Sequence, residues 1–199
     1  MTIEIVSWIA VGVILIASTG LLISRDWRWS LSLLAIQYLA AFGLVIRHWP
    51  IGMASVKLVS GWMAIATLGV THLGISNSES DLETFWPHGR WFRIFLAGIV
   101  ILFTLAAAPR VQVVIPGLGL QVIVGGLLLM GMGLIHLGIT TQLLRVILGL
   151  LTLLIGFEII YAALESSILV AGLIAVVNLG LALAGSYLLV ASSSAEGTE

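Results

Sequence analysis

Residues 142–190 read QLLRVILGLLTLLIGFEIIYAALESSILVAGLIAVVNLGLALAGSYLLV and indicate the fold class more clearly than any other part of the chain. The stretch consists of two apolar runs joined by a short polar turn at 165–167. A helix needs roughly 20 apolar residues to cross a bilayer, and each run is that long. The first run contains the carboxylate of Glu158 and the second contains the amide of Asn178. Ionisable groups inside a spanning helix are costly and usually functional, so the stretch predicts two transmembrane helices that carry a polar site.

The composition extends this prediction to the whole chain. Hydrophobic residues make up 60% of the sequence and charged residues only 9%, whereas a soluble domain carries about 25% charge. Apolar runs recur along nearly the whole length and leave no room for a soluble catalytic domain. We therefore predict an all-α, polytopic transmembrane helix bundle with about seven spans. The predicted spans are 3–23, 31–46, 51–75, 91–108, 117–139, 143–164 and 168–190.

Three segments outside these spans divide the chain. Residues 76–93 form a polar loop within an N-terminal unit, 1–108, that holds the first four helices. Residues 109–116 are bounded by two prolines, and 111–115 is too short to cross, which favours an extended interfacial linker. A three-helix unit follows at 117–190, and the polar tail 191–199 is predicted to be disordered.

Arginines in the short loops favour one orientation. With the N-terminus outside, most of them fall on the cytoplasmic side, as the positive-inside rule requires, so we predict an N-out, C-in topology. The arginines on the predicted cytoplasmic side are Arg25, Arg28, Arg90, Arg93 and Arg145. Arg145, at the start of a predicted helix, is interpreted as a topology anchor whose guanidinium reaches the headgroups.

Several functional classes are excluded. The chain has no cysteine, which removes disulfides, thiolate metal sites and thiol catalysis. Its net charge of −1 gives no reason to expect nucleic acid as a partner. No glycine motif follows a strand to suggest a nucleotide site, and no catalytic residue is predicted.

Two histidines form a possible polar pair. His72 and His136 both lie near predicted cytoplasmic helix ends, and each is followed by Leu-Gly. Two histidines without a carboxylate at helical spacing are a weak metal signal, so no metal is predicted. Haem ligation by two facing histidines is the only cofactor idea left open, and the prediction is that the chain has none.

Lys57 and Glu158 are the strongest candidates for a site. Each lies about six residues from the predicted outer end of its helix, which is about 9 Å at 1.5 Å per residue. Equal depth and opposite charge make them plausible partners on an ion or proton path. The alternatives are a purely structural ion pair, or separate snorkelling of Lys57 to the headgroups. Asn178, predicted near mid-membrane, is a third candidate for the path, although an intramembrane Asn more often donates a hydrogen bond between helices.

The last three predicted helices resemble the K subunit of respiratory complex I. The resemblance lies in the cytoplasmic entry Gln142-Leu143-Leu144-Arg145, in Gly149, and in Gly156-Phe157-Glu158. That family places an acid on its third helix where this chain has Asn178, and its first carboxylate position aligns with Leu150 or Leu151. An amide cannot carry a proton as a carboxyl group can.

The whole chain resembles the E-type membrane subunit of hydrogenase-4 more closely. That family carries a lysine after small and polar residues on its third helix, and here Ala54-Ser55-Val56-Lys57-Leu58 matches it. The resemblance implies a non-catalytic, multi-pass component of a membrane oxidoreductase complex in a bacterial or archaeal plasma membrane. Its implied partners are lipids and other integral membrane subunits, and its implied role includes a contribution to a proton path. A self-standing small transporter and a structural or assembly protein remain the alternatives.

Overall fold

The computed structural model describes residues 2–75 and 89–196, and within these residues the chain forms seven helices. All seven are long and apolar enough to span a membrane, which confirms the predicted all-α, polytopic fold. The helices are α1 (Thr2–Ile23), α2 (Trp27–Val45), α3 (Ile51–Ile75), α4 (Arg90–Val114), α5 (Leu120–Ile139), α6 (Leu143–Leu164) and α7 (Ile168–Glu196). The N-out orientation stays a prediction. We therefore call the end of the bundle where α1, α3, α5 and α7 begin the N-terminal face, and the opposite end the C-terminal face.

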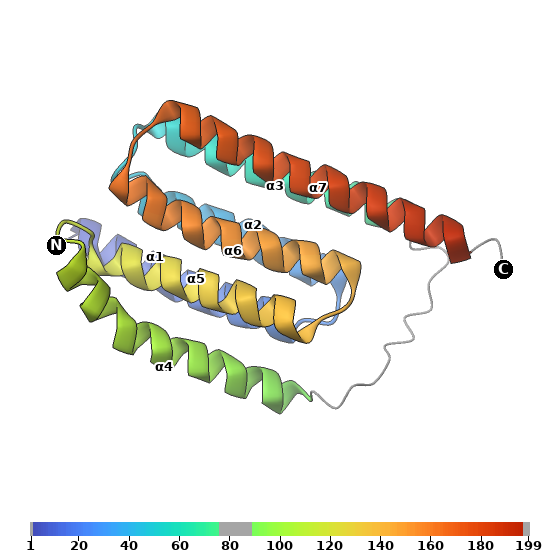
Figure 1. The fold of residues 1–199 in the computed structure, drawn as a ribbon, viewed down its shortest axis with the longest axis horizontal. Coiled ribbons are helices and arrows are strands. Elements are labelled where there is room, and N and C mark those ends of the chain that lie inside the picture. Colours follow the sequence, from blue (N-terminus) through green and yellow to red (C-terminus); the bar gives the residue numbers. More distant parts are fainter. Residues whose placement is uncertain (1, 76–88, 197–199) are drawn as a thin grey trace.

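The helices form two layers with one additional helix at an edge. Figure 1 shows α1, α2 and α3 behind α5, α6 and α7, and the packing contacts pair α1 with α5, α2 with α6 and α3 with α7. Helix α4 lies outside the layers, against α5 and α1. The central position of α2 and α6 brings polar side chains on these helices into the interior of the bundle.

Glycines explain the closest contact in the bundle, between α5 and α6. A Cβ atom at Gly156 would lie 2.7 Å from the carbonyl oxygen of Gly126, and one at Gly133 would lie 2.7 Å from the backbone nitrogen of Leu153. Small residues at a helix interface let the two backbones approach closely, which is how helices gain van der Waals contact inside a bilayer. Gly126 and Gly133 on α5 and Gly156 on α6 therefore allow the close approach of these two helices.

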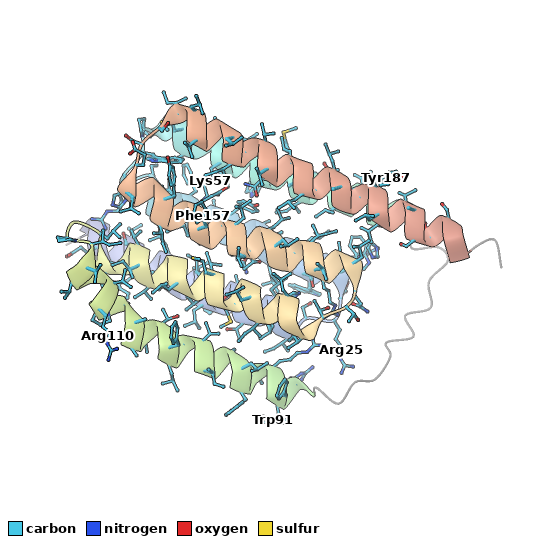
Figure 2. All side chains as sticks on the ribbon, in the orientation of Figure 1. Arg25, Lys57, Trp91, Arg110, Phe157 and Tyr187 are labelled. Carbon is cyan, nitrogen blue, oxygen red and sulfur yellow. The ribbon has the colours of Figure 1, made fainter. Side chains whose placement is uncertain are left out.

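The edge helices are packed on one side only. In the apolar spanning stretch of α2, α5 and α6 about half of the residues are buried, compared with 22% in α3, α4 and α7. Figure 2 shows Trp91 on the free side of α4 and Tyr187 on the free side of α7. Both side chains are exposed, so these edges present apolar surface to whatever surrounds the bundle.

The predicted linker at 109–116 is wrong for most of its length. Helix α4 continues through Pro109 to Val114, and Figure 1 shows the helix turning near that end. Proline removes one backbone hydrogen bond and typically kinks a helix, but an extended 111–115 segment would leave several backbone groups unpaired in an apolar environment. The helical solution therefore satisfies more of the backbone.

Two further boundaries differ from the prediction. Helix α7 extends to Glu196, so most of the tail predicted to be disordered is helical, and α2 begins at Trp27 rather than at Leu31. The side chain of Asp26 caps α2 by accepting a hydrogen bond from the backbone nitrogen of Arg28 at 2.9 Å. Such a cap satisfies one of the unpaired donors at a helix start and favours the earlier boundary. Most of the predicted polar loop at 76–93 lies outside the described residues, and α4 already begins at Arg90.

Candidate functional site

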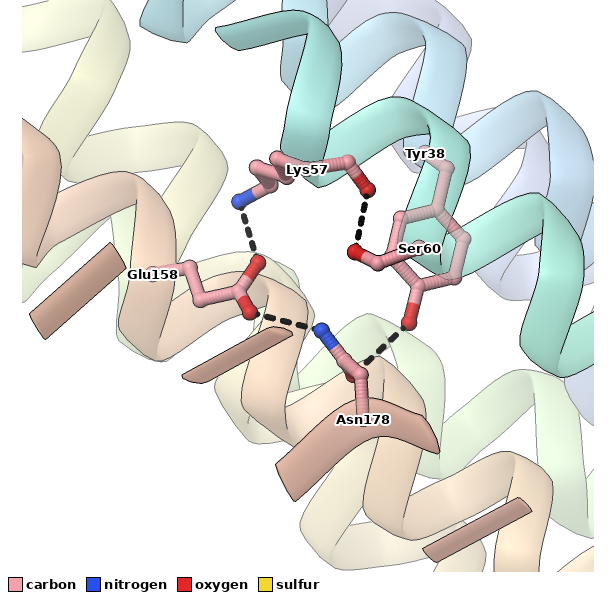
Figure 3. Close-up of polar contacts among 5 residues, drawn as sticks. All are labelled: Tyr38, Lys57, Ser60, Glu158 and Asn178. Atoms are coloured by element: carbon pink, nitrogen blue, oxygen red, sulfur yellow. Dashed lines mark hydrogen bonds and ion pairs between the residues drawn. The ribbon is translucent and has the colours of Figure 1, made fainter. Parts of the chain in front are cut away.

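Lys57 and Glu158 form a buried ion pair that joins α3 to α6. The Lys57 Nζ atom lies 2.6 Å from Glu158 Oε2, and the two side chains are only 5% and 4% exposed (Figure 3). Two opposite charges in an apolar interior both lose their hydration, and their mutual attraction offsets that cost. The alternative in which Lys57 snorkels separately to the headgroups is therefore wrong, because its ammonium group turns inward to Glu158.

Asn178 and Tyr38 extend the pair into a hydrogen-bonded network. Asn178 Nδ2 donates to the second carboxylate oxygen of Glu158 at 2.8 Å, and Tyr38 Oη donates to Asn178 Oδ1 at 3.0 Å (Figure 3). Both residues are fully buried. One connected polar network, Tyr38–Asn178–Glu158–Lys57, therefore links α2, α7, α6 and α3.

The backbone of α3 makes room for this network. A Cβ atom at Gly61 would overlap the ring of Tyr38, so the absence of a side chain there lets the ring lie directly against α3. One residue earlier, Ser60 Oγ donates to the backbone carbonyl of Lys57 at 3.0 Å and so satisfies its own hydroxyl within the helix (Figure 3). Local sequence on α3 therefore positions both Lys57 and the aromatic ring that closes the other end of the network.

Helix positions place the ion pair at one depth. Lys57 lies about six residues after the start of α3 and Glu158 about six residues before the end of α6, which is about 9 Å from the N-terminal face in both cases. The α3 and α7 helices pack tightly together, while α6 contacts α7 and α2. The long side chain of Lys57 bridges the space between α3 and α6.

A second buried polar contact joins α2 and α6 on the side of the network nearer the C-terminal face. Thr152 Oγ1 lies 3.1 Å from Gln37 Oε1 and 2.8 Å from the carbonyl oxygen of Leu148. Gln37 is completely buried, and its Nε2 atom has no hydrogen-bond partner among the described residues. A buried donor without a partner is rare in proteins and calls for an explanation.

Sequence reasoning identifies three of the residues in this region and misses the others. Lys57, Glu158 and Asn178 meet in one network, whereas Tyr38, Gln37 and Thr152 are not predicted to take part. The sequence does contain a signal for Gln37 and Tyr38, because they are adjacent polar residues in the middle of the apolar span of α2. Thr152 carries no comparable signal, because a threonine is common in spanning helices and can bond to its own backbone.

The two histidines have different surroundings. His72 stacks on Trp27, with 4.8 Å between ring centroids, whereas His136 is buried on α5 near Gly149 of α6. The two imidazoles therefore have different neighbours, and their pairing stays a prediction. Within the described ranges, no group of three or more side chains of the kind that bind metals comes together.

Arg145 lies at the start of α6, close to the C-terminal face. Its guanidinium donates to the carbonyl oxygen of Arg25, in the loop between α1 and α2, at 3.2 Å. The side chain is only 8% exposed, so it packs against the end of the bundle rather than extending freely from it. Its role in setting the topology stays a prediction.

The chemistry available to the network is proton exchange. The Glu158 carboxylate can gain a proton and the Lys57 ammonium can lose one, while Asn178 donates a hydrogen bond to the carboxylate and Tyr38 holds Asn178 in place. An ionised Glu158 can only accept hydrogen bonds, whereas a protonated one also donates. Protonation would therefore change which hydrogen bonds the Glu158 carboxyl group can make in this arrangement.

Comparisons with protein-family models, with curated proteins and with solved structures each give no match. Within residues 2–75 and 89–196, the seven apolar helices indicate a multi-pass integral membrane protein, and the buried polar network is its most distinctive feature.

Proposed function

We propose that this chain is a non-catalytic integral membrane subunit of a complex I-like or membrane-bound hydrogenase-type respiratory assembly, and that the Lys57–Glu158 pair contributes to a proton path in it. The observation that carries the proposal is the ion pair itself, closed at 2.6 Å inside a bundle of apolar helices. Ionisable residues in spanning helices are rare, face the interior and usually mark ion pathways or proton relays.

The network around the pair supports a role in proton transfer. Glu158 is held by Lys57 on one oxygen and by Asn178 on the other, from two different helices. A proton arriving at Glu158 would neutralise the carboxylate and release the ammonium group of Lys57. Because the two partners lie on α6 and α3, that event changes the force between two helices, which is the kind of coupling that a proton-driven subunit requires.

The edges of the bundle support membership in an assembly. In the apolar spanning stretches of α3, α4 and α7 only 22% of the residues are buried, so these helices offer broad apolar faces to neighbouring subunits. On α7, Gly172 and Gly180 have nothing within 4 Å of their Cβ positions. A helix of another protein can approach α7 closely at these small residues. The plasma membrane of a bacterium or archaeon, implied by the resemblance to the E-type membrane subunit of hydrogenase-4, is part of the same proposal.

The first experiment asks whether the chain belongs to an assembly. A tagged chain is purified in mild detergent from membranes of the organism that encodes it, and the co-purifying proteins are identified. We expect a stoichiometric complex that contains further integral membrane subunits and a redox protein. Recovery of the chain alone, or only as a homo-oligomer, would contradict membership and favour the transporter or structural alternatives.

The second experiment asks whether Glu158 takes part in proton translocation. Proton uptake driven by the assembly is measured in inverted vesicles with the wild-type chain, with Glu158→Gln and with Thr104→Val as a matched control. Thr104 is a buried polar residue on α4, away from the network. We expect Glu158→Gln to lower translocation at an unchanged amount of assembled complex, and Thr104→Val to leave it unchanged. Full translocation in Glu158→Gln would assign the ion pair a structural role instead.

A further inference from the structure

Buried polar residues lie almost entirely on one side of the ion pair. On the four helices that build the network, Lys57 and Glu158 are the buried polar residues nearest the N-terminal face among the described residues. The others all lie deeper or towards the C-terminal face: Ser30, Gln37, Tyr38, Ser60, Arg145, Thr152, Asn178 and Ser186. The site thus sits closer to the N-terminal face but has its polar surroundings on the opposite side.

A tryptophan closes the short route to the N-terminal face. Trp49 lies in the connection between α2 and α3 and is only 5% exposed. Its indole Nε1 donates to the carbonyl oxygen of Glu165, in the connection between α6 and α7, at 3.0 Å. The buried positions between this bridge and the ion pair are apolar, including Ala54 on α3 and Ala162 on α6. These buried side chains offer a proton no hydrogen-bonding group, and the polar side chains on the same stretch, Ser55 and Tyr161, are only half-buried.

Incompletely bonded polar groups mark the opposite route. Gln37 Nε2 and Ser186 Oγ are buried and have no hydrogen-bond partner among the described residues. Leaving a buried donor unsatisfied is unfavourable, and a water molecule that accepts from it would remove that cost. Along α6, Thr152 lies about six residues beyond Glu158, and Arg145 follows about two turns later at the C-terminal face. Along α7, Ser186 lies about two turns beyond Asn178.

We infer that protons reach Glu158 from the C-terminal face, through water held by Gln37, Thr152 and Ser186, and that Trp49 closes the path on the N-terminal face. This inference rests on the proposed function, since it gives the direction from which the same carboxylate is served. The titratable groups that face Glu158 are Lys57 and, through Asn178, Tyr38. An incoming proton binds a Glu158 oxygen and replaces the charge contact with Lys57, and no other bond is made or broken.

The test reads the protonation of Glu158 while the pH is set separately on the two sides of a membrane. The full chain is reconstituted into sealed liposomes and treated with dicyclohexylcarbodiimide, which dissolves in the bilayer and reacts with protonated carboxyl groups. Labelling of Glu158 is measured by peptide mass spectrometry. The chain has no cysteine, so an added Ser194→Cys near the C-terminal face reports orientation by its reaction with a membrane-impermeant maleimide.

We expect the labelling rate of Glu158 to rise when the pH is lowered at the C-terminal face and to be unaffected by the pH at the N-terminal face. Thr152→Val should slow labelling several-fold at an unchanged fold, whereas the matched Thr104→Val should not. Trp49→Ala should make labelling respond to the pH at the N-terminal face. Glu158→Gln, which removes the reacting group, should abolish labelling at this position.

Two outcomes would overturn the inference. Labelling that follows the pH at the N-terminal face in the wild-type chain reverses the direction, and labelling that follows neither side removes the path. The outcome is independent of the assembly experiment. If Glu158→Gln leaves proton translocation intact while labelling still follows the C-terminal face, the proposed function fails and the access route stands.

Discussion

Removing one charge of the Lys57–Glu158 ion pair should destabilise the bundle far more than removing both charges together. At 2.6 Å, two unit charges attract each other by about 6 kcal/mol at an effective dielectric constant of about 20. Desolvation offsets much of this attraction, and breaking a buried pair by removing one partner typically costs about 3–5 kcal/mol. Lys57→Met leaves the Glu158 carboxylate buried without its counter-charge, so we expect a loss in that range. The unfolding equilibrium constant would then rise more than about a hundredfold.

The double variant Lys57→Met/Glu158→Gln removes both charges and keeps an oxygen that can accept the hydrogen bond from Asn178. We expect it to be more stable than Lys57→Met alone, with a coupling energy of about 2–3 kcal/mol between the two sites. Stability is measured by titrating sodium dodecyl sulfate into the micelle-bound protein and following tryptophan fluorescence and circular dichroism. Lys57→Met combined with Thr104→Val provides the control, because residues on remote helices should give additive effects.

Additive costs at Lys57 and Glu158 would refute the reasoning. In that case the carboxylate would lose nothing when its partner is removed, and the ion pair would not stabilise the bundle. A coupling energy at the control pair as large as that at the ion pair would point to global loosening rather than to a specific contact.

Three further predictions concern the packing around the site. Gly156→Ala should destabilise the α5–α6 contact by about 1–3 kcal/mol, because its Cβ would lie 2.7 Å from backbone atoms, whereas Gly138→Ala, with open space around it, should be neutral or stabilising in the same unfolding titration. Tyr38→Phe should cost about 1 kcal/mol by removing the hydrogen bond to Asn178 without creating a cavity, and an unchanged midpoint would mean that this bond is absent in the bilayer. Trp49→Phe removes the indole donor, so amide hydrogen exchange in the connection between α6 and α7 should accelerate, and identical exchange would contradict the bridge.

The fold is predictable because the bilayer restricts the backbone conformations that can span it. Only helices satisfy the backbone within a spanning segment, so apolar runs of sufficient length determine the number and order of helices. The same constraint explains the error at 109–116, where the prediction ends a helix at a proline. In an apolar environment one lost hydrogen bond at Pro109 costs less than an extended segment, and α4 continues to Val114.

The ion pair and Asn178 are predictable from the sequence, but the other residues around them are not. Equal depth and opposite charge place Lys57 opposite Glu158, since an unpaired charge in that position is expensive. Depth alone does not determine which faces of two helices meet. His72 and His136 show this, because both lie near the C-terminal face and yet have different neighbours. Tyr38 joins the network only because Gly61 allows its ring to lie against α3, which is a property of the packed structure.

Infrared difference spectroscopy on native membrane vesicles tests most directly whether Glu158 changes its protonation state. An acid jump on one side, combined with a potassium diffusion potential, imposes a proton-motive force, and the spectra before and after are subtracted. We expect a carboxylic-acid C=O band to appear in the wild-type chain and to be missing in Glu158→Gln, with Thr104→Val resembling the wild type. Identical difference spectra for wild type and Glu158→Gln would contradict the account, because the buried carboxylate would then keep its charge while the membrane is energised.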